Sequence, residues 1–397
     1  MPSCFKCSQF KQKMKIGVMT FWHGNSNYGQ IMQCWAMQQY LKRQGHEPYI
    51  IRFVPSNYSS SLKRFLKKVL LIEHIRKAKE FLFKQDAFLI KRRNEMNDSK
   101  RQFDDFRQKH LDFSDHLYYD IIQIRKNPPV ADAYIVGSDQ VWAQMLDNIN
   151  SRAFYLDFGK PETKRIAYAP SFVVKEYPAA YRKDLNSLLK RFDAVSTREY
   201  SGVDICKSVG IEAIKVLDPT LLLDRNDYLS LIVEPVEKKK QIFIYSLNIS
   251  SSEQIRWEEL KKYAIDNDKK VVVTPSQGYF AADELFGDDV EYLYATPQQW
   301  LRTIAESELV VTPSFHGVAL SIIMGIPFIY VPLKGAYESG NARVDDLLKD
   351  LQLSPRILSD GVQYNTLAEQ AINWNTVSLA LTRYRSSSYE FLKNCGI

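Results

Sequence analysis

Short apolar, β-branched runs alternate with helix-period segments along most of this sequence. The first unit joins KIGVMTF at residues 15–21 to a helix pattern at 29–44 and to a second apolar run, PYIIRF, at 48–53. Parallel strands need a crossover connection, usually a helix, and that crossover is almost always right-handed. The alternation therefore predicts an α/β fold built on parallel sheets.

The alternation occurs in two series, separated by the polar run PVEKKK, and this predicts two domains. The first series continues with strands expected at 133–138, 165–172, 193–198 and 214–219. The second has strands expected at 241–247, 269–275, 308–312 and 327–332. A length of 397 residues suits two α/β domains of ordinary size. We expect doubly wound domains at about 14–225 and 226–375, with a tail at 1–13 and a C-terminal helix at 376–397.

The segment TPSFHGVALSIIMGIPFIYVP, residues 312–332, places a histidine where a strand turns into a helix. Ser314 is expected to cap this helix, which leaves Phe315, His316 and Gly317 in its first turn. Free N–H groups and the positive end of the helix dipole gather there, at the sheet edge that faces the ligand crevice. Gly317 is expected to let a ligand approach the backbone. The pattern predicts an anion site containing a titratable group; the alternative is a histidine bonded to a carbonyl.

Two polar loops follow predicted strands of the first domain. They are GNSNYGQ at residues 24–30 and GSDQVW at 137–142. The first is not a dinucleotide fingerprint, because the GxGxxG spacing is absent. Carboxylate, amide and aromatic groups at the ligand edge of a sheet suit a sugar, although each loop alone could be ordinary turn chemistry. We predict an acceptor site formed by Asn25, Asn27, Tyr28, Ser138, Asp139 and Gln140.

Two arginines stand at the ends of predicted elements. Arg198 closes the strand in AVSTREYSG, and Arg343 precedes the helix in GNARVDDLL. A guanidinium can hold a carboxylate or phosphate through two parallel bonds, which a lysine cannot imitate. The alternative for Arg198 is a surface pair with Glu199. The sequence contains no HxH or HExxH motif and no clustered carboxylates, so neither a metal nor a bound cofactor is predicted.

The net charge of +7 favours anionic partners. Much of the excess lies in a predicted helical insertion at about 60–110, whose first helix is amphipathic and basic. Such a helix could lie on an anionic membrane surface or pack on its own domain. No apolar run approaches the roughly 20 residues of a membrane span, and we expect a cytoplasmic protein that can act at the inner face of the membrane. The lone pair Cys4 and Cys7 is interpreted as part of a loose tail, not a zinc site.

Several motifs, taken in order, resemble the polysaccharide pyruvyl transferase family. They are NYGQIMQCWAMQQYL, FDDFRQKHL, AYIVGSDQVW, RIAYAPSF, FDAVSTREYSG, VLDPTLLL, VVTPSFHGVALSIIMGIPFI and ARVDDLL. The resemblance runs from about residue 14 to about 355. It implies two Rossmann-like domains in a GT-B-like arrangement, with phosphoenolpyruvate as donor and a sugar hydroxyl pair as acceptor. The expected product is a pyruvate ketal on a surface polysaccharide or its lipid-linked precursor, with no nucleic-acid partner.

The same resemblance implies roles for individual residues. His316 corresponds to the family's functional histidine, and Arg198 to its donor-binding arginine. The sequence departs from the family in TPSFHG, where TDSFHG is common, so Pro313 supplies no carboxylate to orient His316. We expect His316 to protonate the donor's methylene carbon or to assist the departing phosphate. The donor site is predicted to comprise Arg198, Ser314, Phe315, Gly317 and Arg343.

Two other functions fit the same architecture. A glycosyltransferase would bind a nucleotide sugar, and Glu306 and Glu308 are the candidate carboxylates for its ribose. A non-catalytic carbohydrate-binding protein of the same pathway would bind no donor. The choice of donor therefore separates the three possibilities.

Overall fold

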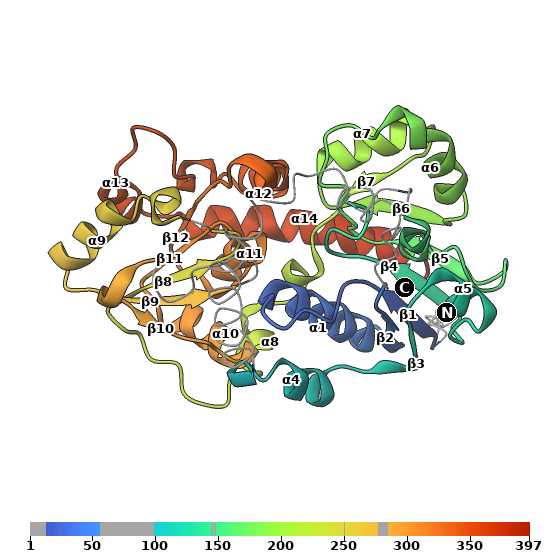
Figure 1. Ribbon diagram of the computed structural model, residues 1–397, viewed down its shortest axis with the longest axis horizontal. Coiled ribbons are helices and arrows are strands. Elements are labelled where there is room, and N and C mark those ends of the chain that lie inside the picture. Colours follow the sequence, from blue (N-terminus) through green and yellow to red (C-terminus); the bar gives the residue numbers. More distant parts are fainter. Residues whose placement is uncertain (1–12, 56–98, 144–145, 147, 250, 277–284) are drawn as a thin grey trace, which may run out of the picture.

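The computed structural model describes residues 13–55, 99–143, 146, 148–249, 251–276 and 285–397. The predicted tail and most of the predicted basic insertion lie outside these residues. The described chain forms two lobes, each containing one sheet (Figure 1). Helix α1 (Tyr28–Arg43) lies where the two lobes meet, and helix α14 (Trp374–Asn394) runs from one lobe to the other.

The first lobe is built on a seven-stranded sheet in which every pair of neighbouring strands is parallel. The strand order β3-β2-β1-β4-β5-β6-β7 reverses direction between β1 and β4, as in a doubly wound fold. Its strands are β1 (Lys15–Met19), β2 (Glu47–Phe53), β3 (Phe113–Tyr118), β4 (Ala133–Val136), β5 (Lys164–Ala167), β6 (Ala194–Thr197) and β7 (Ile214–Lys215).

The second lobe repeats this plan with a five-stranded parallel sheet of order β10-β9-β8-β11-β12, which reverses between β8 and β11. Every residue of β8 and β11 is buried, as expected for parallel strands covered on both faces. The strands are β8 (Gln241–Ser246), β9 (Lys270–Pro275), β10 (Glu291–Tyr292), β11 (Leu309–Thr312) and β12 (Phe328–Tyr330). The expectation of two doubly wound domains in a GT-B-like arrangement is confirmed.

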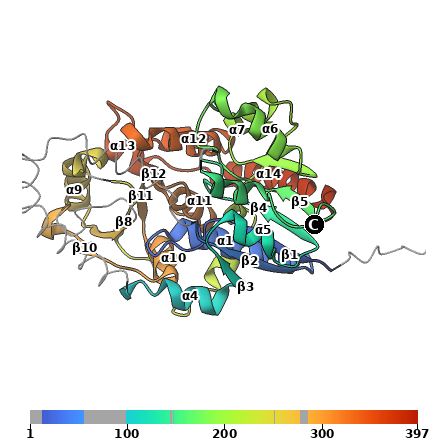
Figure 2. The same ribbon diagram turned by 45° about the vertical axis from the view of Figure 1, so that its right-hand side comes forward.

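Helices cover both sheets (Figure 2). Those of the first lobe, besides α1, are α4 (Phe103–His110), α5 (Ile121–Lys126), α6 (Arg182–Leu189), α7 (Tyr200–Ser208) and α8 (Arg225–Leu229). Those of the second lobe are α9 (Trp257–Asp266), α10 (Pro297–Glu306), α11 (Phe315–Met324), α12 (Ala342–Asp350) and α13 (Tyr364–Glu369). Short 3₁₀ turns lie at η1 (Ile149–Tyr155), η2 (Ala179–Tyr181), η3 (Pro219–Leu221), η4 (Ser252–Ile255), η5 (Gly287–Asp289), η6 (Gly335–Asn341) and η7 (Ser354–Arg356).

One apolar core contains residues of both lobes, and each lobe has a second core of its own. Helix α1 of the first lobe packs against α10 and α11 of the second, and the ring of Tyr28 stacks on Trp300 with centroids 5.2 Å apart. Helix α14 leaves the second lobe and packs on the first, where Ser388 accepts a hydrogen bond from the Leu217 N–H at 3.0 Å. The relative position of the two lobes is therefore set by buried apolar contacts.

Several predicted strands are shorter than the sequence pattern indicates. The strand expected at 165–172 ends at Ala167, and Ala169 has a positive φ of 55°, so the chain leaves the sheet there. The strand expected at 214–219 ends at Lys215, because Asp218 caps a 3₁₀ turn. The strand expected at 15–21 ends at Met19. Strands β3 and β10 were not predicted, because three polar residues in a row interrupt FSDHLY and because β10 is only two residues long.

Candidate active site

A cavity of about 530 Å³ lies between the lobes, at the edge where both sheets reverse their strand order. Loops after β1, β4, β8 and β12 reach it, as expected for the ligand crevice of doubly wound domains. Its size falls in the range of small-molecule sites. Its walls are formed by Phe21, Asn27, Gln30, Asp139, Gln140, Val173, Leu247, Asn248, Leu333, Tyr337, Ser339, Gly340 and Arg343.

A buried carboxylate, Asp218, stands at the centre of a polar network near this cavity. It follows β7, and its Oδ1 accepts from the backbone N–H of Thr220 at 3.0 Å and from the Thr220 hydroxyl at 2.7 Å. Its Oδ2 accepts from the Ser138 hydroxyl at 2.6 Å and from Nη1 of Arg198 at 2.8 Å. Both oxygens are thereby fixed in position.

The electrostatic surroundings keep Asp218 ionised. Burial alone would raise the pKa of this carboxyl group. Nearby His316, Arg198 and the Ser138 hydroxyl act in the opposite direction and hold the pKa of Asp218 well below its ordinary value. The carboxylate is therefore a permanent negative charge beneath the site.

Arg198 is almost completely buried, with 2% of its surface exposed. Its guanidinium lies over the Phe315 ring at 4.7 Å and uses Nη1 for Asp218, while Nη2 is 3.9 Å from Oδ1 of Asp139 on the cavity wall. Within the described part of the chain, Nε and Nη2 have no hydrogen-bond partner. Buried charged donors are normally satisfied, so these two N–H groups indicate a place for an anionic ligand.

His316 lies in the first turn of α11, as predicted, and is 6% exposed. Its Nε2 is 3.5 Å from Oδ2 of Asp218. On its other edge, the first turn of α1 passes so close that a Cβ on Gly29 would be 2.1 Å from Nδ1. The histidine of the second lobe is thus held between two elements of the first. The alternative interpretation, a histidine bonded to a backbone carbonyl, does not describe Nε2, because the group that faces this atom is the carboxylate of Asp218.

Arg343, at the start of α12, lines the cavity. The amide of Gln140 is assigned with its oxygen toward this guanidinium, where it accepts from Nη1 at 2.9 Å and Nη2 at 2.8 Å. Burial, together with the neighbouring charge of Arg198, lowers the pKa of Arg343 to about 10, so it is still a cation at neutral pH. Two arginines from different lobes therefore stand at one site.

The alternative interpretation, that Arg198 and Glu199 form an ion pair on the surface, is wrong, because both side chains are buried. Oε1 of Glu199 accepts from the Ser171 hydroxyl and the Phe172 N–H, each at 2.9 Å. Burial raises the pKa of Glu199 despite the nearby arginines. Glu199 thus anchors the chain after β5, while the Arg198 guanidinium lies buried between Asp218 and the Phe315 ring, behind the cavity wall.

The remaining donor residues have defined local roles. Ser314 caps α11, as predicted, since its hydroxyl accepts from the Gly317 N–H at 3.3 Å. A Cβ on Gly317 would be 2.7 Å from Oγ1 of Thr312, so the side of Gly317 on which a side chain would stand faces β11. Gly317 thus allows α11 to pack closely on β11.

The predicted acceptor residues divide into two groups. Asn27, Asp139 and Gln140 line the cavity. Asn25 accepts from Arg107 at 3.1 Å, and Tyr28 is buried with its hydroxyl donating to the Ala295 carbonyl at 2.6 Å. The Ser138 hydroxyl is directed to Asp218. These last three residues do not appear on the cavity walls, because each side chain is already engaged elsewhere.

The sequence did not single out Asp218 or the cavity residues Asn248 and Tyr337, and it placed Gly29 in a ligand-edge loop without its contact to His316. Asp218 lies in the VLDPTLLL motif, and the signal that could have found it was a carboxylate directly after a predicted strand end. Gly29 gave the weaker signal of a glycine in the first turn of a helix, where it costs helix stability relative to alanine. Neither feature of the sequence predicts that Asp218 and Gly29 lie next to His316.

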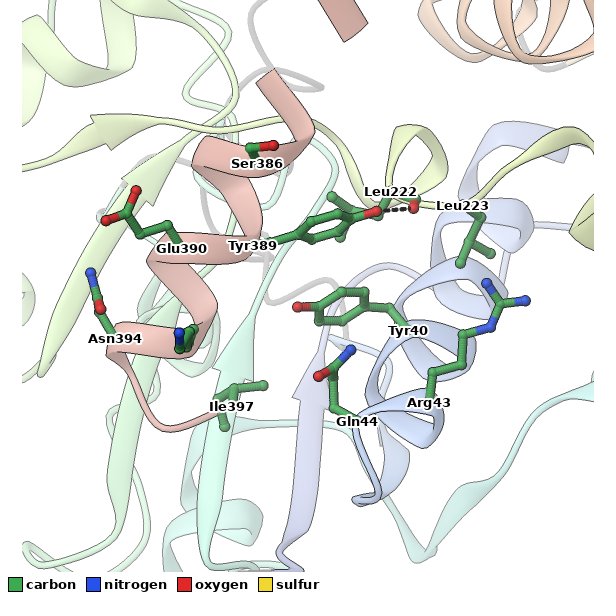
Figure 3. Close-up of a pocket in the computed structure, with 11 residues that line it drawn as sticks. Tyr40, Arg43, Gln44, Leu222, Leu223, Ser386, Tyr389, Glu390, Asn394 and Ile397 are labelled. Atoms are coloured by element: carbon green, nitrogen blue, oxygen red, sulfur yellow. Dashed lines mark hydrogen bonds between the residues drawn. The ribbon is translucent and has the colours of Figure 1, made fainter. Parts of the chain in front are cut away.

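A larger cavity, about 700 Å³, lies away from this network, between the end of α1, residues 222–223 and α14 (Figure 3). Tyr40 and Tyr389 stack along it with centroids 5.5 Å apart, and the Tyr389 hydroxyl donates to the Leu222 carbonyl. None of the predicted site residues lines it. We identify the smaller cavity as the candidate site because buried cations and the histidine gather beside it.

The carboxylates considered for a nucleotide ribose lie at the opposite edge of the second sheet. Glu306 ends α10 and pairs with Lys239 and Arg302, while Glu308 precedes β11 and pairs with Lys269. Ligands of doubly wound domains bind at the carboxyl ends of the strands, so neither glutamate is placed for that role.

Two further searches concern the described residues only. No group of three or more His, Cys, Asp or Glu side chains there could hold a metal ion. Within the same ranges, no helix combines the length and apolar character needed to cross a membrane.

Two doubly wound domains with a cavity between their switch points, lined by Arg343, form a GT-B-like architecture. A family model described as polysaccharide pyruvyl transferase matches residues 27–334, most of the chain. The chain therefore belongs to the polysaccharide pyruvyl transferase family, and it is a transferase of polysaccharide biosynthesis. No curated protein matches the sequence significantly.

Similar solved structures share little sequence with this chain. UGT89C1 of Arabidopsis thaliana, complexed with UDP-L-rhamnose, has 10% identity and a TM-score of 0.48, over 97% of this chain and 99% of that one. An alpha-glucosyltransferase in complex with UDP has 9% identity and a TM-score of 0.47, over 96% and 95%. UDP-N-acetylglucosamine 2-epimerase from Rickettsia bellii has 12% identity and a TM-score of 0.44, over 94% and 95%.

Proposed function

We propose that this protein transfers a pyruvyl group from phosphoenolpyruvate to a pair of sugar hydroxyls, forming a pyruvate ketal. One observation carries the proposal: Arg198 is buried with two N–H groups that lack partners among the described residues, beside a second arginine and the first turn of α11. Phosphoenolpyruvate carries a carboxylate and a phosphate, and both require fixed cationic donors. Membership of the family supplies the reaction class.

In the proposed reaction, His316 supplies the proton that the donor needs, and the acceptor hydroxyls return it. His316 donates a proton to the methylene carbon of phosphoenolpyruvate, which becomes a methyl group as one sugar hydroxyl attacks the adjacent carbon. The second hydroxyl attacks the same carbon and inorganic phosphate leaves. Of the two hydroxyl protons, one replaces the proton given by His316 and the other leaves with the phosphate. General acid–base help of this kind typically contributes about 10²- to 10⁴-fold in rate.

The acceptor is proposed to bind in the cavity between the lobes. Asn27, Asp139 and Gln140 from the first lobe and Asn248 from the second offer amide and carboxylate groups to sugar hydroxyls. The aromatic ring of Tyr337, 46% exposed on the cavity wall, offers an apolar face to the sugar C–H groups. We propose a sugar of a surface polysaccharide, or of its lipid-linked precursor, as acceptor.

The first test is calorimetric titration of phosphoenolpyruvate, against a panel of nucleotide sugars, into wild type and Arg198→Lys. Lysine keeps a cation beside Asp218 but removes the unpartnered guanidinium N–H groups, so the fold is retained. Loss of charge-assisted bonds worth about 1.5–3 kcal/mol should raise the Kd for phosphoenolpyruvate by roughly 10- to 100-fold. The matched control is Arg225→Lys, an exposed arginine of α8, which should leave the Kd unchanged.

The outcomes separate the possible functions. Binding of a nucleotide sugar in place of phosphoenolpyruvate would make the protein a glycosyltransferase. If neither phosphoenolpyruvate nor any nucleotide sugar binds, the protein is better described as a non-catalytic carbohydrate-binding protein. Equal binding of phosphoenolpyruvate by wild type and Arg198→Lys would remove Arg198 from the donor site.

We further propose a cytoplasmic enzyme that acts at the inner face of the membrane, because the sequence of the basic insertion carries much of the excess positive charge. Deleting residues 60–95 should then abolish cosedimentation with anionic vesicles, with neutral vesicles as the control. Unchanged cosedimentation of a folded deletion variant would contradict this location.

A further inference from the structure

The network around Asp218 joins the two lobes. Asp218, Arg198 and Ser138 belong to the first lobe, and His316 belongs to the second. The Oδ2 atom of Asp218 is shared by the Ser138 hydroxyl and Arg198 Nη1, and it lies 3.5 Å from Nε2 of His316. One carboxylate oxygen therefore contacts the donor-binding arginine and faces the proposed acid.

The carboxylate is held rigidly enough to impose an orientation on both partners. Its Oδ1 is fixed by the backbone N–H and the hydroxyl of Thr220, which belongs to the η3 turn that Asp218 itself caps. The η3 turn in turn packs on α1 and α11. Asp218 thus cannot rotate without breaking these bonds, and it is fully shielded from solvent.

The sequence places no carboxylate beside His316 on its own loop, because residue 313 is proline. A histidine used for proton transfer normally needs a partner that fixes the ring and its tautomer. Here the partner comes from the other lobe. Nε2 lies 3.5 Å from Oδ2 of Asp218 and has no hydrogen-bond partner among the described residues, so the charge of the carboxylate, acting across this gap, favours a proton on Nε2, while Nδ1 is on the edge next to Gly29.

We propose that Asp218 is the positioning residue of this active site, which orients Arg198 and fixes the tautomer of His316 across the interface between the lobes. This inference rests on the proposed function for its kinetic consequences, but not for the tautomer itself. Asp218 acts through its two partners and makes no contact with substrate in this scheme. Its consequence is that the catalytic geometry exists only when the two lobes are docked.

The test combines kinetics with ¹⁵N NMR of histidine-labelled protein. Asp218→Asn keeps the shape of the side chain and an oxygen for Thr220 but removes the charge. We expect kcat to fall about 100-fold or more with a smaller change in KM for phosphoenolpyruvate, since misplacement of a reacting group is costly. The His316 resonances, assigned with His316→Gln, should move from the tautomer protonated on Nε2. The control is Asp204→Asn, at an exposed aspartate of α7, which should change neither readout.

An Asp218→Asn variant with wild-type kcat and an unchanged His316 tautomer would overturn the proposal. If wild type does not turn over phosphoenolpyruvate, the proposed function fails, and the NMR measurement alone decides the role of Asp218. If Asp218→Asn does not fold, Thr220→Val replaces it, because it retains the charge and removes one bond to Oδ1. That variant should lower kcat several-fold with a shifted His316 resonance; an unaltered kcat and resonance would contradict the positioning role.

Discussion

Replacing His316 by alanine is expected to lower kcat by about 10²- to 10⁴-fold, the usual contribution of a general acid. Phosphoenolpyruvate should still saturate the variant, because Arg198 and Arg343 retain their charges and positions. The physical reason is specific to this site: His316 lies in the first turn of α11 with its Nε2 facing an ionised carboxylate. Steady-state kinetics with formation of inorganic phosphate as the readout measures the effect.

The matched control is His116→Ala, which makes the same substitution at an exposed histidine of β3. Its kcat and KM should equal those of wild type. A His316→Ala variant that turned over at a near-normal rate with saturable donor would show that another group donates the proton. A variant that lost donor binding but kept its rate at saturation would move His316 to the donor site alone.

Replacing Gly29 by alanine is expected to lower kcat/KM by about 10²-fold, although alanine is the better helix former. A Cβ at this position would be 2.1 Å from Nδ1 and 2.4 Å from Cγ of His316, closer than real Cβ contacts allow. Either α1 or the imidazole must move, and the imidazole is buried between the two lobes. Overpacking of this kind should also lower the free energy of unfolding by about 1–3 kcal/mol, measured by urea denaturation.

The double variant Gly29→Ala with His316→Ala tests this explanation directly. Removing the imidazole removes Nδ1 and Cγ, the two nearest atoms, and leaves the Cβ of residue 316 at 2.7 Å, so the double variant should regain part of the stability lost by Gly29→Ala. Its activity should be no lower than that of His316→Ala alone. Additive losses of stability in the double variant, or a Gly29→Ala variant more stable than wild type at full activity, would show that the contact does not constrain the site.

Much of the fold followed from the sequence because it is encoded locally. Apolar runs with β-branched residues predicted the central strands, and the cap of α11 at Ser314 followed from the residue type alone. The edge strand β3 escaped prediction, since half of its side chains are exposed and its polar residues stand in a row, which leaves no regular apolar signal. The ends of β5 and β7 were also mispredicted. The residues that follow each strand are apolar and buried, so the sequence pattern continues, but they do not pair with a neighbouring strand.

The candidate site was only partly readable. His316, Arg198 and Arg343 were identified because each stands at the end of a predicted element, where doubly wound folds place ligands. Tyr28 was assigned to a ligand because it follows a polar loop, yet it stacks on Trp300 between the lobes. A side chain at a helix start can point to the crevice or to the core, and the loop sequence does not distinguish these directions.

What the sequence determined by itself is the central strands with most of the helices, their parallel arrangement in two domains, and the position of a histidine at a helix N-terminus. Only the tertiary structure decided which groups surround that histidine. Asp218 and Ser138 meet although they are 80 residues apart, and Gly29 reaches His316 from the other lobe. Strand ends are specified by neighbouring residues, whereas these contacts depend on how α1, η3 and α11 pack across the shared core.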